Sequence, residues 1–253
     1  MSPAAGRLAS RKAVVTGGLR GIGRGIALGF AGEGADVAVM DIRPESEAAS
    51  LVEAITKTGG RGLYVQADVS NEAQVERAIQ HVIDAFGRVD ILVNNAGIVL
   101  ESPVAEMPIA DWDRIMNVNL RGVFICTRFV LPHMLKQGGG RIINMASQLG
   151  QIGGRTMAHY SASKAGVIGF TRALAREVSR DNVLVNAIAP GPINTDMLAG
   201  ESEEWKRAKL AELPIGRFGE VAEVVPTAVF LASDDSRYYV GQVLGPNGGD
   251  VMF

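Results

Sequence analysis

The sequence predicts an α/β protein with a doubly wound, parallel, seven-stranded sheet that carries helices on both faces. Short β-branched runs alternate with longer amphipathic segments, which is typical of strand–helix–strand units around a parallel sheet. No internal repeat, low-complexity tract or long linker interrupts this alternation. Because one α/β domain commonly spans about 200–250 residues, we expect a single domain over residues 1–253.

Each predicted strand is a short run rich in valine and other apolar residues, and each predicted helix is a longer segment with apolar residues at helical spacing. The strands are predicted over residues 12–16, 37–41, 62–66, 91–93, 141–145, 183–189 and 242–244. The helices are predicted over residues 22–33, 46–57, 71–86, 111–135, 159–179, 203–213 and 221–232. Strands and helices therefore follow one another along most of the chain.

Composition restricts the class of protein. Hydrophobic residues make up 47% of the chain and charged residues 21%, which fits a globular protein with a sizeable core. The formal net charge is −2 and basic residues do not cluster, so neither a nucleic acid nor a membrane is an expected partner. The single cysteine, Cys126, excludes an internal disulfide framework.

No apolar run approaches the roughly 20 residues of a membrane span, and residues 1–12 lack the apolar region of a signal peptide. We expect a cytoplasmic protein.

A glycine-rich segment, Thr-Gly-Gly-Leu-Arg-Gly-Ile-Gly at residues 16–23, follows the first predicted strand and opens the first helix. Glycine permits positive φ and lets a diphosphate approach the backbone closely. The free amides and the positive dipole end of the helix would face that phosphate. The segment therefore indicates a nucleotide-binding loop, and the alternative is a tight strand–helix turn. The candidate contacts are Gly17, Arg20, Gly21, Ile22 and Gly23.

Asp41 ends the second predicted strand, eighteen residues after Gly23. A carboxylate at this position accepts hydrogen bonds from both hydroxyls of an adenosine ribose and repels a 2′-phosphate. Arg20 and Arg43 favour a 2′-phosphate. We expect the repulsion between Asp41 and that phosphate to outweigh them, because Asp41 would lie closer to the ribose. The sequence therefore predicts NAD rather than NADP as the cofactor.

Two further segments follow predicted strands, and ligands bind at the carboxyl ends of the strands in such sheets. Asp68 and Val69 suit a contact with the adenine amino group, and an acidic loop cap is the alternative. Residues 94–97, Asn-Asn-Ala-Gly, provide two amide side chains that can tie loop backbones together beside the cofactor, and a plain turn is the alternative. The candidate contacts there are Asn95, Ala96 and Gly97.

Tyr160 and Lys164 lie four residues apart in a predicted helix, and Ser147 lies thirteen residues upstream of the tyrosine. Residues at a spacing of four share one helix face, with Cβ atoms roughly 5–6 Å apart. The ammonium of Lys164 would favour the phenolate and lower the tyrosine pKa from its ordinary value of about 10. The pair predicts a proton donor that works near neutral pH, and an ordinary surface pair is the alternative.

Together these segments resemble the short-chain dehydrogenase/reductase family, with its Rossmann-type sheet, over nearly the whole chain. The resemblance rests on residues 16–23, Asp68, 94–97, Asn119, Ser147, Tyr160, Lys164, Pro190 and Gly191. It implies hydride transfer between a nicotinamide and a secondary alcohol or ketone, and a homotetramer. It implies that the turn after the sixth strand contacts the nicotinamide carboxamide through Ile193 and Thr195. It also implies a catalytic tetrad of Asn119, Ser147, Tyr160 and Lys164.

The chemistry of the four residues agrees with that implication. Tyr160 can give a proton to a carbonyl oxygen in reduction and remove the alcohol proton in oxidation. Ser147 can hydrogen-bond the same oxygen, and Lys164 can also hold the nicotinamide ribose. Asn119 can interrupt the regular bonding of its helix and hold a water that links Lys164 to solvent. A buried helix asparagine with a local hydrogen bond is the alternative for Asn119.

The substrate candidates are Ser147, Gln148, Arg155, Met157 and Trp205. Arg155 can receive a carboxylate or sulfonate, although a solvated loop arginine is the favoured interpretation. Residues 196–213 are predicted to form a movable lid over the substrate. No metal site is expected, because His81 and His133 lie in predicted helices without partner residues.

The sequence thus predicts an NAD(H)-dependent oxidoreductase that interconverts a secondary alcohol and a ketone, with Tyr160 as general acid and base. The first alternative is an NADPH-dependent 3-oxoacyl reductase, since the general likeness is to family members of that kind and to polyol or hydroxy-acid dehydrogenases. Asp41 departs from the NADPH-using fatty-acid reductases. A remote alternative is a non-catalytic nucleotide-binding regulatory protein, against which the intact tetrad argues.

Overall fold

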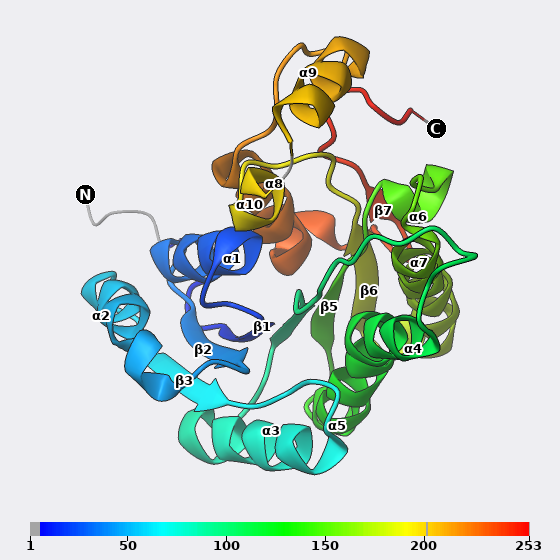
Figure 1. Cartoon of the computed structure of the whole chain (residues 1–253). Coiled ribbons are helices and arrows are strands. Elements are labelled where there is room, and N and C mark those ends of the chain that lie inside the picture. The colour runs from blue at the N-terminus through cyan, green and yellow to red at the C-terminus, as the bar shows by residue number, and fades with distance from the viewer. Residues whose placement is uncertain (1–5, 201, 253) are drawn as a thin grey trace.

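A computed structural model describes residues 6–200 and 202–252; the two ends of the predicted domain and residue 201 of the predicted lid lie outside the described residues. Seven parallel strands form one sheet in the order β3-β2-β1-β4-β5-β6-β7, which confirms the predicted fold class (Figure 1). The strands are β1 Lys12–Thr16, β2 Asp36–Asp41, β3 Gly62–Gln66, β4 Ile91–Asn94, β5 Gly140–Met145, β6 Val183–Ile188 and β7 Val243–Leu244. The strand order reverses beside β1, which is where doubly wound sheets bind ligands.

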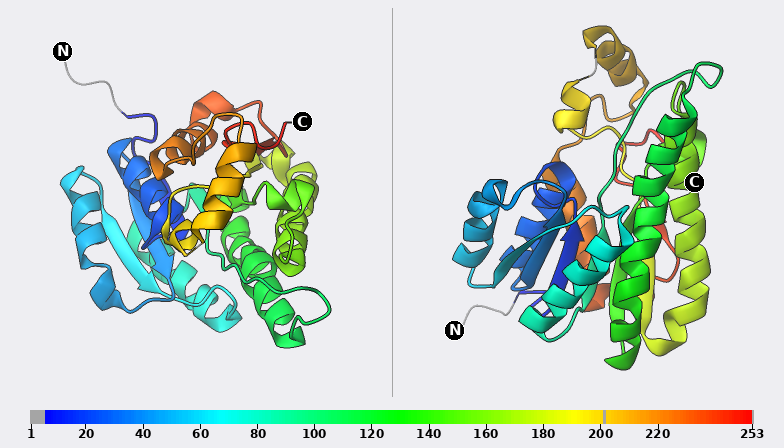
Figure 2. Two further views of the ribbon diagram at one scale, coloured as in Figure 1. Left: turned by 45° about the horizontal axis from the view of Figure 1, so that its top comes forward. Right: turned by 60° about the horizontal axis from the view of Figure 1, so that its bottom comes forward.

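Helices cover both faces of the sheet (Figure 2). On one face pack α1 Gly21–Gly32, α2 Ala49–Lys57 and α10 Val221–Ala232, and on the other pack α3 Glu72–Phe86, α5 Gly122–Lys136 and α7 Ala158–Val178. The remaining α-helices are α4 Ile109–Met116, α6 Leu149–Ile152, α8 Asp196–Ala199 and α9 Glu203–Glu212. Both α8 and α9 stand at one end of the molecule, beyond the sheet (Figures 1 and 2). Among the described residues, no helix has the length and apolar character that a membrane crossing needs.

Alternate residues of the central strands face opposite helix layers. In β1, Ala13 and Val15 join the core beneath α1, whereas Val14 joins the core beneath α3. All three side chains are fully buried, because helices cover the sheet on both sides. This double burial explains why the strands are nearly continuous apolar runs in the sequence.

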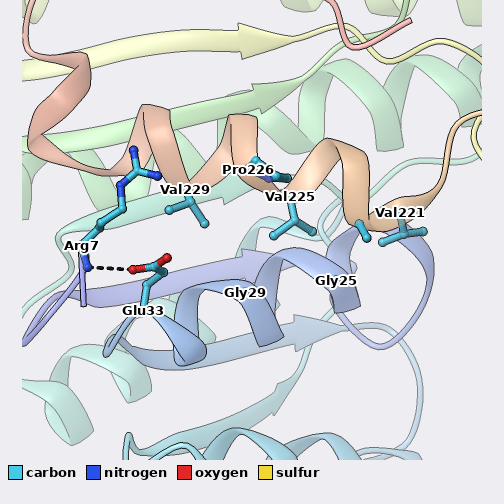
Figure 3. Close-up of a pocket in the computed structure, with 9 residues that line it drawn as sticks. Arg7, Gly25, Gly29, Glu33, Val221, Val225, Pro226 and Val229 are labelled. Carbon is cyan, nitrogen blue, oxygen red and sulfur yellow. Dashed lines mark hydrogen bonds between the residues drawn. The ribbon is translucent and has the colours of Figure 1, made fainter. Parts of the chain in front are cut away.

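Helices α1 and α10 pack closely because α1 presents glycines to α10 (Figure 3). A Cβ atom at Gly25 would lie 2.3 Å from Cγ1 of Val221, and a Cβ atom at Gly29 would lie 2.3 Å from Cγ1 of Val225. Larger residues at either position would therefore push the two helices apart. The contact fixes the position of α1, whose first turn follows the glycine-rich loop.

The helix predicted over residues 111–135 is longer and less regular than expected. It begins at Ile109 as α4, passes through a π-helical turn at Asn117–Arg121 (η2), and continues as α5 to Lys136. A π-helical turn interrupts the regular bonding of the helix and is frequent at functional sites. Helices α6 and α8 were not predicted from the sequence, since four-residue helices are too short to show a periodic pattern.

Candidate active site

The glycine-rich loop between β1 and α1 has a shape that depends on its glycines. Gly17 has a φ of +62° and Gly21 a φ of +51°, in a region that other residues rarely adopt. A Cβ atom at Gly23 would lie 2.3 Å from the carbonyl oxygen of Gly17. The loop therefore folds tightly and brings the free amides of the first turn of α1 to the carboxyl end of β1, an arrangement suited to a diphosphate.

Asn95 fastens the glycine-rich loop to the loop that follows β4. Its Nδ2 donates hydrogen bonds to the carbonyl oxygens of Thr16 and Gly17, both at 2.9 Å. In return, Oγ1 of Thr16 accepts hydrogen bonds from the backbone N–H groups of Asn95 and Ala96, both at 3.0 Å. The structure shows the tie that the sequence predicted for Asn95, and it adds Thr16, which the sequence analysis did not single out.

Asp41 lies at the end of β2, beside the glycine-rich loop, and is 9% exposed. Its Oδ2 accepts a 3.1 Å hydrogen bond from the backbone N–H of Leu19, and its Oδ1 accepts a 3.2 Å bond from that of Arg43. These two bonds hold the carboxylate at the side of the loop. A carboxylate fixed there suits ribose hydroxyls and opposes a 2′-phosphate.

The two arginines that favour a 2′-phosphate are paired with other acids. Arg20 lies 3.6 Å from Asp196 in an exposed ion pair that connects the glycine-rich loop to α8. Arg43 forms an ion pair with Glu47. Neither guanidinium pairs with the Asp41 carboxylate in the part of the chain that the structure describes. Neither arginine therefore forms an ion pair that would offset the negative charge of Asp41.

Asp68 caps its own loop. Its Oδ1 accepts hydrogen bonds from the backbone N–H and the hydroxyl of Ser70, at 2.8 and 2.7 Å. This is the loop cap that the sequence offered as an alternative to an adenine contact. Val69 is buried, and a Cβ atom at Gly122 would lie 2.9 Å from its Cγ2. That packing places the loop after β3 against the start of α5.

Tyr160 and Ser147 meet where the first turn of α7 approaches the loop after β5. Burial raises the pKa of the Tyr160 hydroxyl above its ordinary value of 10.0, and a hydrogen bond with Ser147 offsets part of this rise. The sequence predicted a lowered pKa for Tyr160. In the protein without a cofactor the pKa is raised instead. The reason is that removing the phenol from water outweighs the neighbouring interactions.

Lys164 is buried one turn further along α7. Its Nζ donates a 2.7 Å hydrogen bond to the carbonyl oxygen of Met145 and lies 5.7 Å from the centroid of the Tyr160 ring. Burial lowers the pKa of this ammonium from 10.5 to about 8. The lysine therefore remains mostly charged at neutral pH, and its charge lies over the ring of Tyr160.

Asn119 lies in the π-helical turn η2 and is fully buried. Its Oδ1 accepts a 2.8 Å hydrogen bond from the backbone N–H of Ile98, and its Nδ2 donates a 2.9 Å bond to the carbonyl oxygen of the same residue. A Cβ atom at Gly97 would lie 3.3 Å from Oδ1 of Asn119 and 3.5 Å from Nζ of Lys164. The side chains of Asn119 and Lys164 thus both lie close to Gly97, and η2 is the interruption of helical bonding that the sequence predicted.

The loop after β6 connects this cluster to the glycine-rich loop. The carbonyl oxygen of Pro190 accepts a 3.1 Å hydrogen bond from the backbone N–H of Gln148. Further along, Ile193 is buried, and Thr195 begins α8 with its Cγ2 3.5 Å from where a Cβ atom of Gly21 would lie. The loop therefore spans the candidate site from the serine end to the phosphate end.

The structure separates the substrate candidates into near and distant residues. Gln148 directly follows Ser147 and is 4% exposed. Met157 is the residue before α7 and lies three residues before Tyr160. Arg155 is exposed on the turn before α7, which fits the solvated loop arginine that the sequence favoured. Trp205 lies on α9, where its ring stacks on that of Phe218 with 6.4 Å between centroids.

A buried row of polar side chains behind the site was not recognised in the sequence. Nδ2 of Asn94 donates a 2.8 Å hydrogen bond to Oδ1 of Asn144, and Nδ2 of Asn144 donates a 2.9 Å bond to Oγ1 of Thr171. The row connects β4, β5 and α7, and so holds the helix of Tyr160 against the sheet. Its signal in the sequence is a single asparagine within each of the strands β4 and β5.

Two hollows differ in their relation to the site. The larger, about 540 Å³, lies between α1 and α10 and is lined by valines together with Arg7 and Glu33 (Figure 3). It contains none of the candidate catalytic residues. The smaller, about 150 Å³, is lined in part by Ile193, Leu213 and Asn247. It therefore adjoins the loop after β6 and belongs to the candidate site.

The fold and the site define an oxidoreductase of the nucleotide-binding α/β class. A family model described as Enoyl-(Acyl carrier protein) reductase matches residues 17–250. The 3-oxoacyl-[acyl-carrier-protein] reductase FabG of Staphylococcus aureus is 42% identical over 243 residues, which cover 96% of this chain and 99% of that protein. The chain belongs to the short-chain dehydrogenase/reductase family, as its motifs predicted.

Solved structures agree with this assignment. A provisionally named short-chain alcohol dehydrogenase from Sinorhizobium meliloti 1021 is 39% identical with a TM-score of 0.93, covering 96% of this chain and 97% of its own. Levodione reductase is 36% identical with a TM-score of 0.90, covering 96% of this chain and 98% of its own. Family membership implies a nicotinamide dinucleotide, NAD or NADP, as the cofactor.

Proposed function

We propose that the protein is an NAD(H)-dependent oxidoreductase that interconverts a secondary alcohol and a ketone. The observation that carries the proposal is the meeting of Ser147, Tyr160 and Lys164 at the carboxyl end of β5, with Asn119 hydrogen-bonded to Ser163, the residue before the lysine. The glycine-rich loop lies at the carboxyl end of β1 in the same sheet. A bound nicotinamide supplies or accepts the hydride.

The side chains of the chain itself handle the proton. In reduction, Tyr160 donates its hydroxyl proton to the carbonyl oxygen, and in oxidation it removes the proton of the alcohol. The hydroxyl of Ser147 donates a hydrogen bond to the same oxygen and so orients it. The charge of Lys164 stabilises the phenolate that forms when Tyr160 gives up its proton. Asn119, in the π-helical turn, holds a water that links Lys164 to solvent.

The position of Asp41 supports NAD as the cofactor. Its two oxygens are held by backbone N–H groups beside the glycine-rich loop. A 2′-phosphate would place a dianion against this carboxylate, whereas a ribose diol offers it two donors. Arg20 and Arg43 pair with Asp196 and Glu47. In this arrangement they do not neutralise Asp41.

The second candidate is an NADPH-dependent 3-oxoacyl thioester reductase. The names of relatives at 42–43% identity over 96% of the chain favour it more than they favour the first candidate. The same four residues serve both reactions, because a 3-oxoacyl thioester is itself a ketone. The two candidates therefore differ in the cofactor and in the groups that surround the reacting carbonyl.

Titration calorimetry with NADH and NADPH separates the candidates, when followed by absorbance assays at the nicotinamide band. The assay panel contains secondary alcohols, simple ketones and 3-oxoacyl thioesters. Tight NADH binding with turnover of simple ketones supports the first candidate. NADPH preference with turnover of thioesters establishes the second. Failure to bind either nucleotide would favour the remote alternative, a regulatory protein without catalytic activity. Sedimentation at micromolar concentration tests the homotetramer that we also propose.

A further inference from the structure

Two side chains of helix α9, those of Trp205 and Lys209, contact residues outside the helix. None of its described residues is buried, and it stands beyond the sheet and its helix layers (Figure 2). Trp205 stacks on Phe218 on one side. On the other, Nζ of Lys209 lies 2.7 Å from Oδ2 and 3.0 Å from Oδ1 of Asp250, near the end of the chain. The ion pair is therefore a principal contact between α9 and the site.

Asp250 is unusually well covered for an acidic residue. Its side chain is 8% exposed and that of Lys209 is 17% exposed. A covered carboxylate needs both a cation and hydrogen bonds to offset its lost hydration. Lys209 supplies the charge, and Nε2 of Gln148 donates a 2.5 Å hydrogen bond to Oδ2. Asp250 thus joins α9 to the residue that follows Ser147.

The carboxylate of Asp250 also decides which end of the Gln148 amide faces it. A carboxylate only accepts hydrogen bonds, so it selects the NH2 group. The Oε1 atom of Gln148 is consequently directed elsewhere, and it is buried without a hydrogen-bond partner among the described residues. Buried acceptors are rarely left without a donor. An acceptor of this kind beside Ser147 is a position for a donor on a ligand.

We propose that Asp250 is a positioning residue for substrate binding. In this arrangement Lys209 pairs with Asp250, and Asp250 holds Gln148 so that Oε1 accepts a hydrogen bond from a second polar group of the substrate. The preferred substrate is then a ketone or alcohol with a hydroxyl or N–H donor near the reacting carbon. This inference rests on the proposed function and narrows its substrate class.

Limited digestion with trypsin tests the attachment of α9 without any turnover. The helix carries Lys206, Arg207 and Lys209, so opening exposes cleavage sites. Asp250→Asn keeps the shape of the side chain and all three sites but removes the charge. We expect this variant to be cleaved in α9 about tenfold faster than the wild type, because helices held by few contacts open locally.

Glu212→Gln is the matched control. Glu212 also accepts a hydrogen bond from Lys209, at 3.1 Å, but its side chain is 65% exposed. Exposed ion pairs of this kind contribute little to stability, so Glu212→Gln should be digested at the wild-type rate. Asp250→Glu should restore much of the protection. Equal rates for Asp250→Asn and the wild type would overturn the role of Asp250 in holding α9.

Kinetics test the substrate part of the proposal. Hydroxyacetone and butanone differ by a hydroxyl in place of a methyl group next to the ketone. We expect Asp250→Asn to raise KM for hydroxyacetone about tenfold and to leave kcat and the butanone KM nearly unchanged, since one hydrogen bond is lost. Equal effects on both ketones contradict the acceptor role of Gln148. No turnover of any ketone by the wild type overturns the proposed function together with this substrate class, while the digestion still decides how α9 is held.

Discussion

Nζ of Lys164 donates a 2.7 Å hydrogen bond to the carbonyl oxygen of Met145, the last residue of β5. The bond fixes a cation at the carboxyl end of a central strand, where parallel sheets place their ligands. Because this cation is buried, its pKa falls to about 8. The protonation state of Lys164 therefore changes within a pH range in which the folded protein can be studied.

The lowered pKa makes stability depend on pH in a defined window. Lys164 has a pKa of 10.5 when unfolded and about 8 when folded, so the unfolded chain binds the proton more tightly between these values. Burial of the charged form opposes folding below pH 8, and this opposition is relieved as the pH rises towards 10. Relative to Lys164→Met, the wild type should gain about 2–3 kcal/mol of unfolding free energy across the window, at roughly 1.36 kcal/mol per pH unit. Urea titrations of both proteins give this difference, and a pH-independent difference would show that the lysine is not desolvated.

Tyr160→Phe removes the transferable proton and leaves the cofactor site in place. We expect kcat to fall by about 10²–10⁴, the usual contribution of a general acid or base. The dissociation constant of NADH should stay within about threefold of the wild type, a change below 1 kcal/mol. Tyr238→Phe is the control, since Tyr238 is 99% exposed and should leave both quantities unchanged. Steady-state assays and calorimetry measure the two effects, and undiminished turnover in Tyr160→Phe would sink the mechanism.

Asp41→Asn keeps an acceptor for the backbone of Leu19 and removes the charge that opposes a 2′-phosphate. We expect the NADPH affinity to rise relative to that of NADH by about tenfold or more, since roughly 1.4 kcal/mol corresponds to a factor of ten. Glu53→Gln makes the same change in net charge on the exposed surface of α2 and should not alter the ratio. Calorimetric titration of both variants with both nucleotides provides the test. A constant ratio in Asp41→Asn would mean that another residue selects the cofactor.

Two glycines of α1 should respond oppositely to alanine. At Gly23 a Cβ atom would lie 2.3 Å from the carbonyl oxygen of Gly17 and 2.4 Å from Nδ2 of Asn95, so Gly23→Ala should lower stability by about 1–3 kcal/mol. At Gly32 no atom lies within 4 Å of the added Cβ. Gly32→Ala should therefore raise stability by about 0.5–1 kcal/mol, because alanine loses less conformational entropy than glycine when the helix folds. Thermal unfolding measures both changes, and unchanged stability in Gly23→Ala would contradict the tight packing of the glycine-rich loop.

Local relationships in this chain could be predicted from the sequence, because one element contains all the partners. Tyr160 and Lys164 share a helix, so their spacing alone places them on one face. The glycine-rich loop and the first turn of α1 are likewise adjacent in the chain. Asp250 and Gln148, in contrast, are 102 residues apart, and only the completed fold brings them together. No pattern of spacing could identify that pair.

The direction of the Tyr160 pKa shift shows a second limit of sequence reasoning. The spacing correctly places a cation near Tyr160, but the pKa also depends on how completely the hydroxyl is removed from water. That burial arises from the whole arrangement of α7 against the loop after β5. Similarly, the sequence indicated a helix around Asn119 and an interruption there, but the π-helical form depends on how Asn119 binds the backbone of Ile98.

The hydrogen bonds from Asn95 to Thr16 and Gly17 cross the point where the strand order reverses. The glycine-rich loop follows β1, whereas Asn95 comes only after β4, so the loop is synthesised before its partner. A nascent chain that ends before β4 therefore lacks the side chain that holds the carbonyl groups of this loop. The shape of the glycine-rich loop therefore depends on contact between the two halves of the sheet. Cofactor retention would then report that the two halves have assembled.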